Sequence, residues 1–283
     1  MASFTNFATL SYNGGTTNSN IVTGEILEAL TAVKTAVSAN YSAGDRITYA
    51  LSLVNTGTAA ITDYTVTDNL GGYTVGANTV YPLAYNAGTV RYYINGVLQT
   101  APTVTAGPPL TVTGLTVPAG GSAVLIYETT ATPVAPLATG SSITNTATIT
   151  GAGLTNPITA QATVETANSA DLTISKALSP TTVTENGRIT YTFVISNTGN
   201  TEATATGNVV VTDTFAPILR NIAVTYNGTA WTEGANYTYN AATGVFTTLA
   251  GQITVPAASF TQNTDGTFTV TPGTATLVIT GTV

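Results

Sequence analysis

The chain has 283 residues, enough for two ordinary domains, and it contains neither cysteine nor histidine. Disulfides and thiolate metal sites are therefore excluded, and the commonest general base and metal ligand are missing. Only 7% of the residues are charged and the formal net charge is −7, so the sequence offers no basic surface for nucleic acid or an anionic membrane. Because 43% of the residues are hydrophobic, we expect a folded protein rather than disorder, with no cofactor and no metal.

The first 25 residues contain two β-like runs around a Gly-containing turn, in "FTNFATLSYNGGTTNSNIVTGE". Such a pattern predicts a β-hairpin. The segment has no charged region followed by an apolar region, so we expect no classical signal peptide. No apolar run is long enough to span a membrane. We interpret residues 1–25 as an N-terminal arm.

The segment that follows, "GEILEALTAVKTAV", permits either a helix or a strand. Its part "LTAVK" (30–34) matches "LTISK" (172–176) at the offset of a longer internal repeat, which favours the strand. The repeat continues with "DRITYALSLVNTGTA" (45–59) against "GRITYTFVISNTGNT" (187–201), and "YTVTD" (64–68) against "VVVTD" (209–213). Short runs of Val, Ile, Thr and Tyr alternate throughout and are broken by NTG, GG and NG turns. This pattern predicts an all-β chain of two tandem immunoglobulin-like β-sandwich domains, residues 26–167 and 168–283.

The second repeat is shorter than the first. "VPAGGSAVLIYET" (117–129) resembles "VTPGTATLVITGT" (270–282), but only the first copy continues into "SITNTATITGAG" and the strand after it. The counterpart of that segment is the N-terminal arm, where Asn6 matches Asn145 and Ala8 matches Ala147. The second domain is therefore expected to lack its closing strands and to leave an unpaired sheet edge.

The arm has the pattern of a donor strand for such an edge, with Phe4, Asn6, Ala8, Leu10 and Tyr12 on one face. Two arrangements are open: the arm folds back within its own chain, or it enters the next molecule. We favour donation to a neighbour, which does not close on itself and builds a homopolymer head to tail. The alternative is a coincidental match in a Thr-rich chain.

The two lysines of the chain, Lys34 and Lys176, occupy equivalent places in the repeat, and strand alternation puts both on apolar faces. Each repeat adds one Asp and one Asn on core-facing positions. A desolvated lysine is a nucleophile, and a protonated carboxyl can polarise a carboxamide, so the set suits amide formation with loss of ammonia. The candidate groups are Lys34, Asp68 and Asn145 within the first domain, and Lys176, Asp213 and Asn6 of a neighbouring subunit across the joint.

Three alternatives require no covalent bond. The lysine and aspartate could form a buried ion pair hydrogen-bonded to Asn. The lysine could lie exposed on an edge strand and block aggregation. Asp68 and Asp213 could simply cap the turns in "VTDN" and "VTDT".

The segment "DLTISKALSPTTVTENGRITYTFVISNTGNTEATATGNVVVTDTF" resembles the repeat of bacterial surface proteins known as domain of unknown function 11, and "SITNTATIT" resembles its closing strand. "GDRITY" and "NGRITY" depart from the family's usual Pro-Gly-Asp approach to that strand. The resemblance implies immunoglobulin-type sandwiches on a cell wall or spore surface, and a chain of this size is similar to small subunits of clostridial spore appendages. It implies a structural role outside the cell, with possible anchoring or lateral partner proteins.

We therefore expect a structural subunit that is not an enzyme, apart from forming its own cross-links. The rival interpretation is a monomeric adhesin or carbohydrate-binding module with a groove lined by exposed aromatic residues. An enzyme is disfavoured because histidine and cysteine are absent and no spacing marks a carboxylate dyad.

Overall fold

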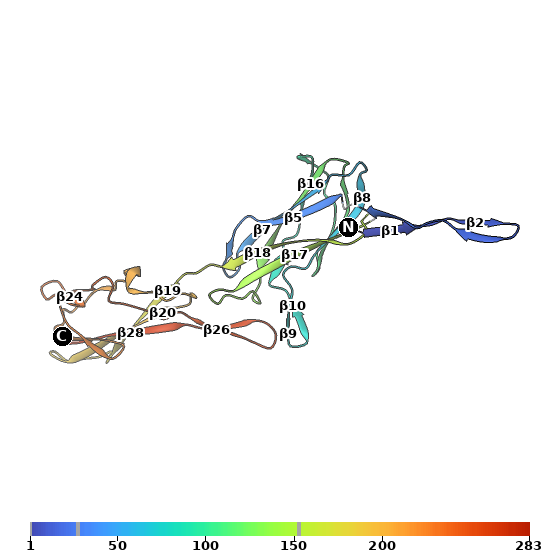
Figure 1. Ribbon diagram of the computed structural model, residues 1–283. Helices are drawn as coiled ribbons and strands as arrows, with labels where there is room; N and C mark the ends of the chain where they lie inside the picture. Colours follow the sequence, from blue (N-terminus) through green and yellow to red (C-terminus); the bar gives the residue numbers. More distant parts are fainter. Residues whose placement is uncertain (1, 27–28, 152–153) are drawn as a thin grey trace. The chain divides into compact units, whose positions relative to one another are not determined.

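The computed structural model describes residues 2–26, 29–151 and 154–283, and it confirms the all-β class with two tandem immunoglobulin-like sandwiches and an N-terminal arm (Figure 1). Within these ranges the chain has no α-helix, and its single helical turn is the 3₁₀ helix η1 (Ala205–Gly207). The described residues divide into two compact units: unit 1 takes residues up to 135 and 142–165, and unit 2 takes 136–141 and 166–283. The segment that could have been a helix contains two strands, because Thr and Val alternate there with inward-facing residues.

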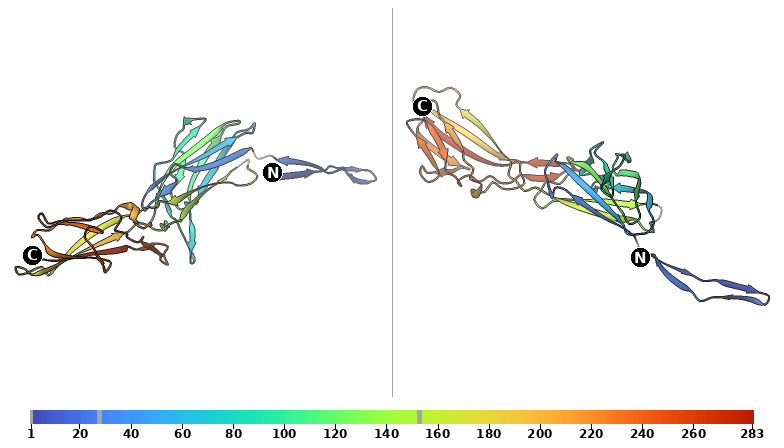
Figure 2. Two further views of the ribbon diagram at one scale, coloured as in Figure 1. Left: turned by 60° about the vertical axis from the view of Figure 1, so that its left-hand side comes forward. Right: turned by 90° about the horizontal axis from the view of Figure 1, so that it is seen from above.

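The arm is a two-stranded antiparallel ribbon, and all three views show it as such (Figures 1 and 2). Its strands are β1 (Ala2–Asn6), β2 (Thr9–Tyr12), β3 (Gly15–Asn18) and β4 (Val22–Ile26). β1 pairs with β4, and β2 pairs with β3 across a tight turn at Gly14. Within the described part of the chain, these strands pair only with one another.

Unit 1 is a sandwich of two antiparallel sheets. The sheet that contains Lys34, called here the lysine sheet, consists of β5 (Leu30–Ala36), β7 (Arg46–Asn55), β11 (Leu83–Tyr85), β12 (Arg91–Ile94), β13 (Val97–Leu98) and β16 (Ser122–Ala131). The sheet that contains Asp68, called the aspartate sheet, consists of β6 (Asn40–Tyr41), β8 (Ile61–Asp68), β14 (Thr103–Thr105), β15 (Leu110–Val117), β17 (Ser142–Thr150) and β18 (Ile158–Thr166). A separate hairpin joins β9 (Tyr73–Val75) and β10 (Asn78–Val80).

Unit 2 repeats the lysine sheet but has a smaller aspartate sheet. Its lysine sheet consists of β19 (Leu172–Ser179), β20 (Arg188–Asn197), β22 (Arg220–Tyr226), β23 (Thr229–Trp231) and β28 (Gly273–Thr282). Its aspartate sheet consists of β21 (Thr212–Thr214), β24 (Tyr237–Asn240) and β25 (Val245–Thr248). A further hairpin joins β26 (Ser259–Gln262) and β27 (Phe268–Thr271).

The two aspartate sheets differ at one edge. In unit 1 the order is β14-β15-β8-β17-β18-β6, so β8 lies between β15 and β17. In unit 2 the order is β24-β25-β21, and within the described residues β21 pairs only with β25. No described strand of unit 2 takes the place of β17 or β18, and this missing pair governs the site described below.

Each unit buries its own apolar core between its sheets. In unit 1 the alternating residues of β7, β8, β16 and β17 point inward, which follows from the period of two in their sequences. The core of unit 2 gathers around Phe215, Phe246 and Leu277, which are almost completely buried. The lysines lie at the margins of these two cores.

Candidate cross-linking sites

The site in unit 1 is closed. Lys34 comes from the edge strand β5, Asp68 ends β8, and Asn145 lies in the middle of β17. Lys34 Nζ lies 2.5 Å from Asp68 Oδ2, and the two side chains are 0% and 1% exposed. All three residues are buried, as strand alternation predicts, and Lys34 and Asp68 are in direct contact.

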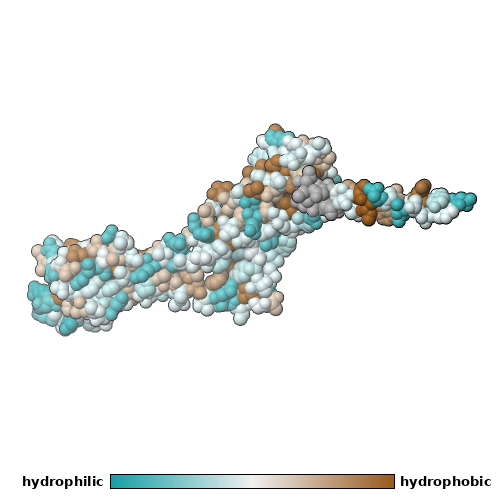
Figure 3. Space-filling view, in the orientation of Figure 1, coloured by the Kyte–Doolittle hydropathy of each residue, from teal (hydrophilic) through white to brown (hydrophobic). Residues whose placement is uncertain are grey.

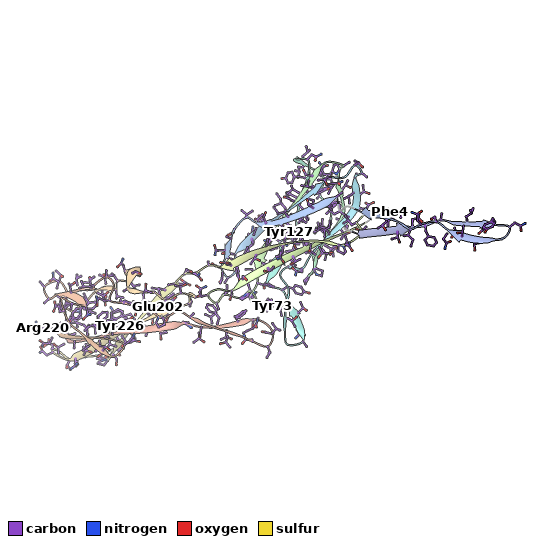
Figure 4. The ribbon with its side chains drawn as sticks, viewed as in Figure 1. Phe4, Tyr73, Tyr127, Glu202, Arg220 and Tyr226 are labelled. Atoms are coloured by element: carbon purple, nitrogen blue, oxygen red, sulfur yellow. The ribbon has the colours of Figure 1, made fainter. Side chains whose placement is uncertain are left out.

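Two tyrosines complete the surroundings of Lys34. Tyr49 and Tyr127 are cross-strand neighbours with stacked rings, and the Lys34 ammonium lies 4.8 Å and 5.8 Å from the two ring centroids. The Tyr127 hydroxyl donates a hydrogen bond to Asp68 Oδ2, so this oxygen is contacted by both the lysine and the tyrosine. Figure 4 labels Tyr127 within unit 1.

Asp68 also holds a turn. Its Oδ1 atom accepts a hydrogen bond from the backbone N–H of Leu70, whose φ is +51°. The turn-capping role considered from the sequence thus coexists with the lysine contact. The exposed-lysine alternative does not apply to Lys34, although β5 is an edge strand.

Burial changes the protonation of this cluster. It lowers the pKa of Lys34 to about 8, even though the nearby charge of Asp68 acts in the opposite direction. Burial, together with the Asp68 charge, raises the pKa of Tyr127 well above its ordinary value, so this hydroxyl stays a donor. The lysine therefore gives up its proton far more easily than a lysine in water.

Asn145 is fully buried and has no hydrogen bond. Neither Oδ1 nor Nδ2 has a partner among the residues that the structure describes. The carboxamide lies near enough to the hydroxyls of Tyr49 and Tyr127 to lower their pKa values, against the larger effect of burial, but no contact has hydrogen-bond geometry. An unpaired buried amide costs about 1–3 kcal/mol, so this carboxamide is a poor structural element as it stands.

These groups suit one reaction. When the proton moves from Lys34 to Asp68, the lysine becomes a neutral amine and the aspartate a neutral acid. The amine nitrogen can then attack Cγ of Asn145, while the acid donates a hydrogen bond to Oδ1. The attacking nitrogen gives one of its protons to Nδ2 by way of the Asp68 carboxyl, the Cγ–Nδ2 bond breaks, and ammonia leaves. Each step uses only groups present in the cluster.

The site in unit 2 is open. Lys176 Nζ lies 2.5 Å from Asp213 Oδ2, as in unit 1, but the two side chains are 41% and 17% exposed. The lysine lies 4.5 Å from the ring centroid of Tyr191, the counterpart of Tyr49. Asp213 Oδ1 accepts from the backbone N–H of Thr214. Within the described residues of unit 2, no asparagine takes the place that Asn145 has in unit 1.

An apolar strip beside Lys176 is also uncovered. Ile174 and Leu178 share the lysine's face of β19 and are 55% and 38% exposed. In unit 1 the corresponding residues of β5 are Ala32 and Ala36, which are half-buried, and Lys34 between them is buried. Val183 is exposed, whereas Tyr41, its counterpart in the repeat, is 1% exposed. Unit 2 therefore presents exposed apolar side chains at the place where unit 1 has β17 and β18.

The arm carries the matching apolar residues, and they face solvent. Phe4, Leu10 and Tyr12 are all exposed, as is Asn6 between them. The space-filling view shows hydrophobic colour along this ribbon, and Figure 4 labels Phe4 on it (Figure 3). Ala8 lies between β1 and β2 and is likewise exposed.

The sequence comparison missed the second tyrosine. Matching "VPAGGSAVLIYET" to "VTPGTATLVITGT" residue by residue places Tyr127 on Thr280. The strand register corrects this by one residue, because Tyr127 lies opposite Tyr49 and Ile279 lies opposite Tyr191. The hydroxyl that contacts Asp68 thus has no counterpart in unit 2, and the repeat contained no signal that pointed to Tyr127.

Comparisons with known proteins give structural matches only. No protein-family model matches the chain, and no curated protein matches it. Among solved structures, the major pilin subunit BcpA of Bacillus cereus matches at 14% identity and TM-score 0.36, covering 96% of this chain and 73% of that one. The pilus backbone protein RrgB of Streptococcus pneumoniae matches at 12% identity and TM-score 0.35, covering 86% of this chain and 55% of that one.

A third match is the N-terminal domain of the Streptococcus gordonii adhesin Sgo0707, at 15% identity and TM-score 0.35. It covers 47% of this chain, which spans about a third (31%) of the adhesin structure. All these TM-scores lie below 0.5, so we argue the function from this chain's own residues. In the described ranges, none of the secondary structure is a helix of the length and hydropathy needed to cross a bilayer.

Proposed function

We propose that this protein is a structural subunit of a fibre on a cell or spore surface, and that it polymerises head to tail by placing its arm in unit 2 of another copy. One observation carries the proposal. The aspartate sheet of unit 2 stops at β21, where that of unit 1 continues into β17 and β18, and the arm has the sequence and the pairing of those two strands.

The fit can be read from the register of unit 1. There Ala147 lies opposite Asp68 and Ile149 opposite Val66. Transferred to unit 2 through the repeat, this register puts Ala8 opposite Asp213 and Leu10 opposite Val211. Asn6 then takes the place of Asn145, beside Lys176.

Docking would supply what unit 2 lacks. The arm's apolar residues would cover the strip along β19, which removes exposed hydrocarbon from both partners. The unpaired edge of β21 would gain main-chain hydrogen bonds, the ordinary basis of strand addition. Each copy would donate its arm to one neighbour and accept the arm of another in unit 2. Such a head-to-tail contact repeats along a fibre without forming a closed ring.

We propose further that both sites form amide cross-links. Lys34 joins Asn145 within unit 1, assisted by Asp68, and Lys176 joins Asn6 of the next copy, assisted by Asp213. Two observations support this assignment: the Lys176–Asp213 ion pair is partly exposed, and the buried carboxamide of Asn145 has no hydrogen-bond partner among the described residues. The second bond makes the joint covalent, and a fibre joined in this way resists heat and detergent.

The test compares matched variants of the full chain. After boiling in SDS, the wild type and Asn145→Ala should both give a ladder of covalent multimers, whereas Asn6→Ala and Lys176→Ala should give none. Intact-mass measurement should show one ammonia lost per bond, and therefore one fewer in Asn145→Ala.

Deletion of residues 2–22 should abolish fibres in electron micrographs and leave a monomer. Normal fibres from this truncated chain would refute strand donation. A ladder that persists in Lys176→Ala would refute the assignment of the joint.

A further inference from the structure

The arm already has the pairing of the two strands that unit 2 lacks. In unit 1, Asn145 of β17 lies opposite Ala162 of β18. In the arm, Asn6 of β1 lies opposite Val22 of β4. The cross-strand partner of the matched asparagine is therefore a small or medium apolar residue in both hairpins.

The neighbouring pair repeats the correspondence on the outer face. Thr144 lies opposite Thr163, with their hydroxyl oxygens 2.9 Å apart and exposed. The equivalent pair in the arm is Thr5 opposite Thr23. The two hairpins thus share the register and the residue types on both faces at this level.

In unit 1 the second strand of the closing hairpin, β18, makes contacts of its own. β18 pairs with β17 on one side and with β6 on the other, and Val164 of β18 is fully buried. The backbone N–H of Glu165 donates to the carbonyl of Ala39 beside β6. In unit 2 the equivalent surface is uncovered, because Val183 is exposed where Tyr41 is buried. Among the described residues, unit 2 therefore has no counterpart of β17 or β18, and a single donated strand would supply only one of the two.

We propose that the arm docks as an intact two-stranded hairpin into unit 2 of a second copy, with β1 and β2 in the place of β17 and β4 in the place of β18. This inference rests on the proposed function, since it specifies how the same joint forms. The two strands of the arm are already paired in the structure, so docking as a hairpin requires no separation of them.

The path of the chain agrees with this placement. β18 ends at Thr166 and is followed by five residues, 167–171, before β19 opens the next unit at Leu172. In the proposed joint, β4 ends at Ile26 and is followed by three residues, 27–29, before β5 opens unit 1 of the donor at Leu30. The joint between copies then has the same strand order as the joint between units, with a connection two residues shorter.

The arm departs from the closing hairpin at two points. Between Asn18 and Val22 it has one residue more than the corresponding stretch of β18. Its turn is shorter, because eight residues separate the paired Thr9 and Asn18, whereas ten separate Thr148 and Thr159. The correspondence therefore holds for the β1–β4 part of the ribbon, which contains Asn6.

A disulfide lock across the hairpin tests the proposal. Thr5→Cys with Thr23→Cys introduces the only two cysteines of the chain, on the face opposite Asn6. Cross-strand pairs lie close to the distance that a disulfide needs. In the oxidised form the two strands cannot separate, whereas the reduced form of the same preparation can open and is its own control.

If the hairpin docks intact, the oxidised variant should form fibres and SDS-resistant ladders at no less than half the rate of the reduced variant. If one strand must separate from the other, oxidation should reduce polymerisation at least tenfold and reduction should restore it, which would overturn the inference while leaving strand donation intact. If neither the wild type nor the reduced variant polymerises, the proposed function itself fails, and the hairpin inference fails with it.

Discussion

Units 1 and 2 contain the same lysine–aspartate contact, with the same 2.5 Å separation, in opposite environments. In unit 1 two further strands cover the pair, and the lysine is completely buried. In unit 2 those strands are missing from the described residues, and the lysine is 41% exposed. The two lysines occupy equivalent places in the repeat, in "LTAVK" and "LTISK", so the difference in environment follows from what covers the pair.

This difference shows that the position of the lysine and the lowering of its pKa have separate causes. Strand alternation alone brings lysine and aspartate together in both units. Desolvation, which lowers the pKa of Lys34 to about 8, requires the closing hairpin. In our proposal the same hairpin carries the asparagine, so the pKa of the lysine falls only when the asparagine is in place beside it.

The largest expected effect comes from closing unit 2 within its own chain. We would move residues 2–26 to the C-terminus, after Val283 and a copy of residues 132–141, which connect β16 to β17 in unit 1. This permuted chain keeps every strand but should be a monomer, because its own arm covers the exposed apolar side chains of unit 2. Light scattering and electron microscopy should show no fibres, and fibres as abundant as those of the wild type would contradict the roles assigned to the two units.

The second prediction compares the covalent contributions to stability in monomers that lack residues 2–22. In our proposal, Asn145→Ala removes the cross-link that closes the loop from residue 34 to residue 145. By analogy with a disulfide, this should lower the free energy of unfolding by roughly 5 kcal/mol. Lys176→Ala removes only a partly exposed ion pair and should cost less than about 1 kcal/mol. Denaturant unfolding measures both, and equal losses would show that unit 1 has no cross-link.

Much of this organisation could be predicted from the sequence. The repeat gave the two domains, and the period of two placed Lys34, Asp68 and Asn145 on inward faces. The two β-like runs around a Gly-containing turn predicted the hairpin of the arm, because the face of a strand and a tight turn are encoded locally. Tyr127 could not be found in this way, since its contact with Asp68 joins two sheets and is missing from the other repeat. The exposure of Lys176 also depends on contacts distant in sequence.

The third prediction uses the pKa of Lys34 in a chain that cannot form the bond. Burial lowers the pKa of the folded Lys34 to about 8, and we expect the same in Asn145→Ala, whereas the unfolded lysine has its ordinary pKa of 10.5. Between these values the unfolded state binds more protons, so the free energy of unfolding rises with pH. The contribution of Lys34 to the free energy of unfolding should be constant below pH 8. It should rise by roughly 1–2 kcal/mol between pH 8 and 9.5.

The matched control is Lys34→Met combined with Asn145→Ala. Both variants keep the buried tyrosines, so the effect of tyrosine titration cancels when their free energies of unfolding are subtracted. The difference between the two unfolding curves should carry the whole pH dependence assigned to Lys34. A difference that stays constant over this range would show that the buried lysine keeps its ordinary proton affinity.

The smallest effect concerns the tyrosine that only unit 1 possesses. Ile279 lies opposite Tyr191, as Tyr127 lies opposite Tyr49, so Ile279→Tyr places a hydroxyl at the equivalent position beside Asp213. A hydrogen bond to a reacting carboxyl contributes about 1 kcal/mol, which predicts covalent locking of the joint roughly fivefold faster. The time course of ladder formation in SDS measures this rate, and Ile279→Phe controls for the added bulk. If tyrosine is no faster than phenylalanine, the Tyr127 contact serves packing in unit 1 rather than the reaction, because the rest of the joint is the same in both variants.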